Sequence, residues 1–94
     1  MAYIYCIKNN INGKCYVGKT LKSPAERFSE HLRDARKPTE ENRPLYRAIK
    51  KYGEDNFSLH VLEECADKFA SSREMWYIEQ LETYAYGYNA TVGG

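Results

Sequence analysis

Two short runs of β-forming residues around a polar turn constrain the fold of this chain more than any other feature. The runs cover residues 3–8 and 14–19, and the turn between them is rich in Asn and ends at Gly13. Such a pattern is typical of a β-hairpin. The sequence therefore predicts two antiparallel strands within the first 20 residues.

Three tyrosines lie on these predicted strands. Residues two apart in a strand share a face, so Tyr3 and Tyr5 point the same way, as do Tyr16 and Gly18. Gly18 lacks a side chain, which lets another group approach the sheet closely. Phenol hydroxyls beside open backbone indicate a site. Tyrosine also suits half-buried strands in general, and the hairpin alone favours that simpler interpretation.

Length and cysteine usage indicate a small intracellular domain. The 94 residues suffice for one domain with a modest core, which we expect to span residues 1–94. No apolar run is long enough for a membrane span or a signal peptide. The three cysteines are odd in number and lack CxxC spacing. This favours reduced thiols in a cytosolic protein over a zinc site or a disulfide framework.

The net charge of +1 conceals a strong asymmetry along the chain. Residues 1–52 contain 12 Lys and Arg against 5 Asp and Glu, whereas residues 53–94 contain 2 against 8. A basic half attracts a phosphate backbone, although the two halves could instead neutralise each other on folding. The low total charge predicts weak intrinsic affinity for DNA, or a further DNA-binding segment outside this chain.

The first predicted helix begins at Ser23, which is followed by Pro24 and, three residues after the cap, by Glu26. This pattern is a capping box with proline at the first helical position, and the helix should run to about residue 36. Arg27 and His31 lie four residues apart on the flank of its apolar stripe. Each could face a cleft or be solvated and ion-paired. These alternatives are balanced for Arg27, and the solvated one is favoured for His31.

Further elements follow along the chain. A polar loop should cover residues 37–43, a second helix residues 45–52 with Gly53 as its cap, and a third strand residues 57–63. The outer face of the second helix is basic, which is typical of an ordinary solvated helix; its cations are Arg43, Arg47, Lys50 and Lys51.

The final predicted helix places one carboxylate on its apolar side. Ser71 is its expected cap, its end is expected at about residues 82–84, and its apolar stripe comprises Tyr77, Ile78, Leu81 and Tyr84. Glu74 falls on this stripe, and carboxylates are rarely buried without a partner. A capping box explains part of its chemistry but not its position facing the sheet. Glu74 is therefore a candidate ligand for a hard cation such as magnesium.

These residues, in this order and spacing, resemble the GIY-YIG nuclease family over residues 3–89. The matching positions are Tyr3-Ile4-Tyr5, Tyr16-Val17-Gly18, Arg27, His31, Glu74, Trp76, Ile78 and the pair Tyr88-Asn89. The chain departs from the family at Tyr3, which replaces a glycine and could narrow the cleft. Within the family, it resembles the catalytic domains of phage-type homing endonucleases.

The resemblance implies an α+β fold, with a small three-stranded antiparallel sheet flanked by about three helices. It also implies hydrolysis of DNA phosphodiester bonds with one divalent metal, Mg²⁺ or Mn²⁺, bound by Glu74. The protein would act in the cytoplasm of a bacterium or a phage-infected cell. The domain could be a fragment that lacks a C-terminal DNA-binding region.

The resemblance further assigns roles to individual side chains. Tyr16 would activate or position the attacking water, with Tyr5 and His31 assisting deprotonation, and Arg27 would stabilise charge on the phosphate. Two more residues would support the site or bind substrate: Lys19 and Asn89. The alternatives are a non-catalytic nucleic-acid-binding module and a protein-interaction domain that uses the aromatic residues near the end of the sequence.

Overall fold

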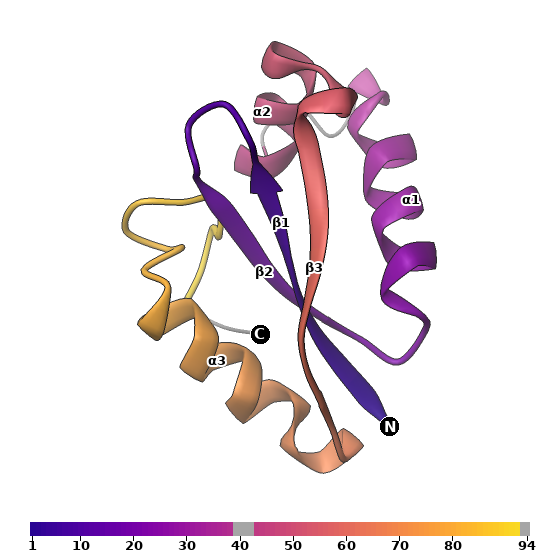
Figure 1. Ribbon diagram of the computed structural model, residues 1–94, viewed down its shortest axis with the longest axis vertical. Coiled ribbons are helices and arrows are strands. Elements are labelled where there is room, and N and C mark those ends of the chain that lie inside the picture. Colours follow the sequence, from indigo (N-terminus) through magenta and orange to yellow (C-terminus); the bar gives the residue numbers. More distant parts are fainter. Residues whose placement is uncertain (39–42, 93–94) are drawn as a thin grey trace.

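A three-stranded antiparallel sheet with helices on both faces forms the framework of the molecule (Figure 1). The computed structural model describes residues 1–38 and 43–92. Its elements are β1 (Ala2–Asn9), β2 (Cys15–Thr20), α1 (Pro24–Ala35), α2 (Pro44–Tyr52), β3 (Phe57–Cys65) and α3 (Ala70–Gln80). Short 3-10 turns at Glu54–Asn56 and Asp67–Phe69 precede β3 and α3. The predicted α+β class and the three antiparallel strands are confirmed.

The strand order is β2-β1-β3, so the predicted hairpin forms the centre and one edge of the sheet. In its register Tyr5 lies opposite Gly18, and Cys6 lies opposite Val17. Gly13 takes a left-handed backbone conformation, with a φ of 78°, as the polar turn returns the chain into β2. The hairpin prediction is confirmed, and its register brings a tyrosine directly over the glycine.

Alternation along β1 divides the core between the two faces of the sheet. Tyr5 and Ile7 are buried against α1 and α2, whereas Ile4 packs with Val17 and Ile78 on the face that α3 covers. Because neighbouring strand residues point to opposite faces, the hairpin can contribute to both clusters. The sheet therefore holds α3 on one side and the α1–α2 pair on the other.

The ends of α1 and α2 form as the sequence predicts. The Ser23 hydroxyl accepts a hydrogen bond from the Glu26 backbone N–H at 3.1 Å, and Pro24 opens α1. Gly53 follows α2 with a φ of 90°, a conformation that favours glycine. The loop predicted for residues 37–43 lies mostly outside the described residues.

The prediction for the last helix was partly wrong. The 3-10 turn leads straight into α3, so Phe69 occupies the cap position and Ser71 lies inside the first turn. The helix ends at Gln80, which leaves Leu81 and Tyr84 47% and 52% exposed instead of buried. The stripe had been extended too far because no glycine or proline marks the end of the helix.

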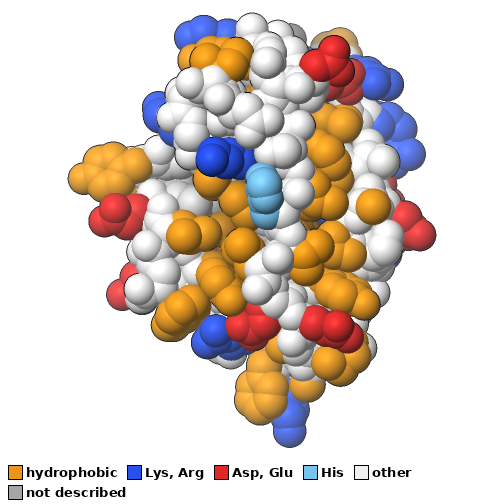
Figure 2. Space-filling view, in the orientation of Figure 1, with side chains coloured by type: hydrophobic (Ala, Val, Ile, Leu, Met, Phe, Trp, Pro, Cys, Tyr) orange, Lys and Arg blue, Asp and Glu red, His pale blue; other side chains and the backbone are white. Residues whose placement is uncertain are grey.

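The basic and acidic halves of the sequence are only partly joined by ion pairs. The Lys19 ammonium lies 3.8 Å from the Glu74 carboxylate, Arg36 lies 2.7 Å from Glu54, and the N-terminal ammonium lies 3.1 Å from Asp67. These three ion pairs each join a residue of the basic half to one of the acidic half. Figure 2 shows other Lys and Arg side chains along the upper rim of the face, where α1 and α2 lie. Within the described ranges, no helix has the length and apolarity to cross a bilayer.

Candidate active site

A small pocket beside the outer strand β2 brings together side chains from both ends of the chain. Its volume is about 150 Å³, and its lining comprises Tyr16, Arg43, Glu74, Ile78, Asn89, Ala90 and Thr91. A water molecule occupies about 30 Å³ in the liquid, so the pocket has room for a few small polar groups. The carboxylate of the last helix and a hairpin phenol therefore border the same cavity.

Packing of α3 on the sheet directs Glu74 to this pocket. Ile78 contacts Val17 in the core, and Glu74 precedes Ile78 by one helical turn, so both side chains face β2. Glu74 is only 7% exposed, and its Oε1 lies 3.8 Å from the Lys19 ammonium. Lys19 also donates a hydrogen bond to the Ser71 hydroxyl at 2.7 Å. Glu74 is thus a nearly buried carboxylate close to the Lys19 ammonium.

On the other face of the sheet, an imidazole lies between two phenols. The Tyr5 hydroxyl is 2.8 Å from His31 Nε2, and the Tyr46 hydroxyl is 2.8 Å from His31 Nδ1. The Tyr16 ring meets the imidazole edge-on, with ring centroids 5.4 Å apart. Two hydrogen bonds and the ring contacts of Tyr16 join these four side chains into a polar chain that leads from the interior to the pocket.

Gly18 makes this arrangement possible. A Cβ atom at this position would lie 2.5 Å from Cζ of Tyr5, far inside van der Waals contact. The phenol of Tyr5 therefore occupies the space that a side chain would take on the opposite strand. The sequence had indicated a close approach at Gly18, and the approaching group is the predicted site tyrosine itself.

Burial keeps the groups of this polar chain neutral. Burial, assisted by the charges of Arg27 and Arg43, lowers the pKa of His31 from 6.5 to about 4. Burial also raises the pKa of Tyr5 and of Tyr16 above the ordinary value of 10, while both arginines act against the rise at Tyr16. At neutral pH both phenols are protonated and the imidazole is uncharged.

The structure corrects the interpretation of His31 as a solvated side chain. His31 is completely buried, and its partners are phenols instead of Glu30 or Asp34. The edge of an apolar stripe on α1 is covered by α2, which a single helical pattern does not reveal. Tyr46, the second partner, was missed; the signal for it was its spacing three residues before Ile49, on the inner side of α2.

Arg27 is ion-paired on the surface of α1 and also faces the candidate site, so both alternatives that the sequence left open apply to it. Its Nη1 atom donates to Glu30 Oε1 at 3.1 Å, as expected of a solvated helix pair. Yet the side chain is half-buried, and its charge influences the pKa values of Tyr5, Tyr16 and His31. The guanidinium therefore lies close to the phenols while it is paired with a carboxylate.

The Asn89 side chain joins the segment that follows α3 to β2 by hydrogen bonds. Its Oδ1 accepts a hydrogen bond from the Val17 N–H at 2.8 Å, and its Nδ2 donates to the Val17 carbonyl at 2.9 Å. One amide thereby satisfies both outward backbone groups of a residue on the edge strand. Asn89 lines the pocket next to Tyr16, and it holds the strand that carries this tyrosine.

Three other sequence positions lie outside the pocket lining. Tyr3 pairs in register with Thr20 and Glu64 and is not among the residues that line the cavity. Lys19 reaches Glu74 from a neighbouring hollow. His60 is exposed on β3, as expected of a surface histidine.

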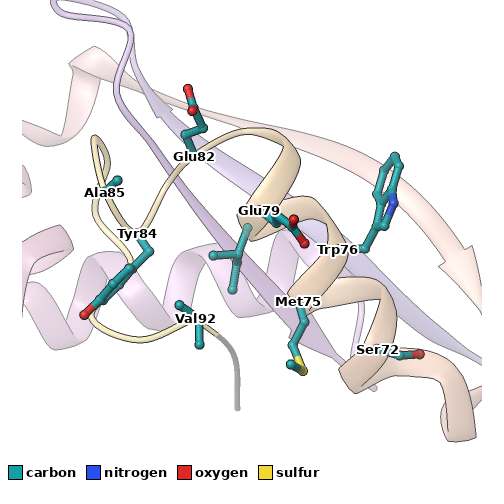
Figure 3. Close-up of a pocket in the computed structure, with 9 residues that line it drawn as sticks. Ser72, Met75, Trp76, Glu79, Glu82, Tyr84, Ala85 and Val92 are labelled. Atoms are coloured by element: carbon teal, nitrogen blue, oxygen red, sulfur yellow. The ribbon is translucent and has the colours of Figure 1, made fainter.

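A second hollow of about 580 Å³ lies on the outer side of α3 (Figure 3). Met75, Trp76 and Val92 give it a mostly apolar wall, and the acidic side chains in its lining are Glu79 and Glu82. Carboxylates repel phosphate groups, so this hollow suits a nucleic-acid backbone less well than the smaller pocket beside β2, which Arg43 also lines.

The donor set suits a hard metal ion with few protein ligands. Among the described residues, no three His, Cys, Asp or Glu side chains are grouped as a ligand cluster. Mg²⁺ usually keeps several waters and takes one or two carboxylates together with substrate phosphates. Glu74 in a polar pocket fits such a site, whereas zinc would require more nitrogen or sulfur ligands.

Comparison with known proteins places the chain in a family. The family model described as the GIY-YIG catalytic domain matches residues 1–89. Intron-associated endonuclease 1 of Enterobacteria phage T4 is 34% identical over 88 residues, covering 92% of this chain and 35% of that protein. Uncharacterized protein 019R of Invertebrate iridescent virus 6 is 32% identical over 97 residues, covering 100% of this chain and 32% of that protein.

A solved structure supports the same relationship. The catalytic domain of the intron endonuclease I-TevI, in a glutamate-to-alanine mutant, is similar with a TM-score of 0.88 and 30% identity, covering 100% of this chain and 98% of that one. Fold and site together define a nuclease catalytic domain. The chain belongs to the GIY-YIG family, whose nucleases generally depend on a divalent metal ion. It spans about a third of the length of the curated relatives it matches.

Burial of His31 predicts a loss of stability in mild acid. The unfolded chain takes up a proton near pH 6.5, whereas the folded imidazole does so only near pH 4, so unfolding binds a proton between these values. Stability is therefore full above pH 6.5 and falls as the pH drops towards 4. We expect the free energy of unfolding to decrease by about 2 kcal/mol from pH 7 to pH 5.

Denaturant titrations at several pH values test this prediction. A His60→Gln variant should show the same decrease as the parent chain, because His60 is exposed. A His31→Gln variant should show a smaller decrease over the same interval. Equal pH dependence in all three proteins would contradict a buried neutral His31.

Proposed function

We propose that this domain is a metal-dependent DNA endonuclease that hydrolyses phosphodiester bonds, of the type found as the catalytic domain of homing endonucleases. The observation that carries the proposal is the pocket shared by Glu74 and Tyr16, with the polar chain of Tyr5 and His31 behind it. A carboxylate for a metal and a phenol for a water molecule are the two groups that such chemistry requires.

Glu74 would be the protein ligand of a single Mg²⁺ or Mn²⁺ ion. When bound, the metal supplies Lewis-acid stabilisation of the charge that develops on the phosphate. Lys19 keeps the apo carboxylate paired, and it can turn to the DNA backbone when Glu74 binds the ion. Asn89 supports the site by holding β2 in place, which fixes the position of Tyr16.

Tyr16 would position the attacking water and accept its proton as the phenolate. Water oxygen forms the new bond to phosphorus, the P–O bond to one deoxyribose breaks, and the departing oxygen takes a proton from solvent. A phenol needs help to ionise near neutral pH. The charges of Arg43 and Arg27 lower the pKa of Tyr16, and Tyr5 lowers it by a smaller amount. Neutral His31 would assist by orienting the Tyr5 hydroxyl, which lies 2.8 Å from its Nε2 atom.

Arg27 would stabilise the negative charge on the phosphoryl oxygens. A preorganised donor of this kind commonly contributes about 10²–10³-fold to the rate of the chemical step. Its pairing with Glu30 orients the guanidinium before substrate arrives. The net charge of +1 predicts weak intrinsic binding to duplex DNA, or a further DNA-binding segment outside residues 1–94.

Incubation of the purified domain with supercoiled plasmid at low salt tests the proposal. We expect nicked or linear products with Mg²⁺ or Mn²⁺, and none after addition of a chelator. Binding of DNA without cleavage in either metal would favour a non-catalytic binding module. Absence of both binding and cleavage would favour a protein-interaction domain.

A further inference from the structure

We propose that Arg43 is a second catalytic arginine of this site, which contacts the phosphate undergoing cleavage in the pocket that Arg43 shares with Glu74. The inference rests on the proposed nuclease function and adds a residue from α2 to it. The sequence had placed Arg43 among the cations of a solvated helix face, and the structure places it in the lining of the pocket.

The start of α2 determines where this guanidinium lies. Arg43 is the residue before Pro44, which opens the helix, and its backbone is extended. The side chain lies over the ring of Tyr46, with Cζ 4.5 Å from the ring centroid. A cation over an aromatic face at this distance is attracted by the ring. Tyr46 is completely buried, so it provides a fixed support for Arg43, which is an exposed residue.

Arg43 lies in the same pocket as the groups that are proposed to react. Arg43, Tyr16 and Glu74 line one cavity of about 150 Å³. A guanidinium can donate two parallel hydrogen bonds to a phosphate, so it suits a substrate held between a metal-binding carboxylate and the arginine. The other hollow on α3 contains no such combination among its lining residues.

The electrostatics of the pocket agree with this geometry. Among the charges that act on Tyr16, that of Arg43 has the largest effect on its pKa, ahead of those of Glu74 and Arg27, and it lowers the pKa. At Tyr5, the main charge that lowers the pKa is that of Arg27. The two arginines therefore divide the site: Arg27 acts beside Tyr5, and Arg43 acts beside Tyr16.

Arg43→Ala and Arg47→Ala provide a matched comparison. Both remove one exposed cation from the cap or the first half of α2, but only Arg43 lines the pocket. With Mg²⁺ and supercoiled plasmid, we expect Arg43→Ala to lower the single-turnover cleavage rate by about 10²-fold, and Arg47→Ala to change it by less than about threefold. Arg43→Lys should recover only part of the rate, because an ammonium lacks the planar fork.

Two further measurements separate catalysis from folding and binding. Denaturant titrations should give Arg43→Ala and Arg47→Ala similar stabilities, and the pH at which the cleavage rate rises should move upward in Arg43→Ala alone. Equal rates and pH profiles for the two variants would overturn the inference while leaving the nuclease function intact. A parent chain that never cuts DNA would instead overturn the proposed function itself.

Discussion

Replacement of Glu74 by alanine is expected to abolish metal-dependent nicking while the domain remains folded. The carboxylate is the proposed metal ligand, and loss of a metal ion or of one preorganised donor costs at least about 100-fold in rate. Lys19 is 34% exposed and keeps its hydrogen bond to Ser71, so its charge stays solvated after the substitution. We therefore expect the free energy of unfolding to change by no more than about 1 kcal/mol.

Glu79→Ala is the matched control for this substitution. It removes the same charge from α3, but its side chain is exposed and faces the apolar hollow shown in Figure 3. Cleavage of supercoiled plasmid by this control should equal that of the parent chain. Undiminished cleavage by Glu74→Ala would defeat the proposed metal site, and circular dichroism would show whether a loss of activity came from unfolding.

Gly18→Ala is expected to damage both stability and activity. The added methyl group would collide with the buried phenol of Tyr5, which is held by its hydrogen bond to His31 and cannot swing into solvent. Overpacking of this kind costs about 1–3 kcal/mol. Movement of Tyr5 would also break the polar chain behind Tyr16, so cleavage should fall even under conditions in which the variant is folded.

A double-mutant cycle isolates this collision. In a Tyr5→Leu background the clashing phenol is gone, so Gly18→Ala should cost clearly less stability there than in the parent chain. Activity should stay low in the double variant, because the hydroxyl that Tyr5 contributes is missing. Equal costs of Gly18→Ala in both backgrounds would show that Tyr5 is not the group that requires the glycine.

The sequence pattern correctly predicted the features that one hairpin or one helix determines by itself. The hairpin follows from two β-rich runs and a turn, and its alternation already placed Tyr16 on the same face as Gly18. The start of α1 follows from Ser23 and Pro24. Glu74 was recognised because a carboxylate on an apolar stripe needs a partner or a ligand.

Contacts between elements could not be predicted in the same way. His31 has the spacing of a flank residue on α1, and only the packing of α2 buries it between Tyr5 and Tyr46. Arg43 looks like any cation on a solvated helix until the fold brings it beside Tyr16. Both positions depend on how α1, α2 and β2 pack against one another. An amphipathic pattern shows which face of one helix is buried, but not which element covers that face.

The Asn89 side-chain amide covers part of the outer edge of β2, which limits how far the domain can be shortened from its C-terminal side. Exposed strand edges offer a template on which other chains can assemble. Here the Asn89 side chain covers Val17, and the Tyr88 N–H donates to the Cys15 carbonyl at 2.8 Å. Versions that stop before residue 88 would present an unprotected edge and would tend to polymerise through strand addition.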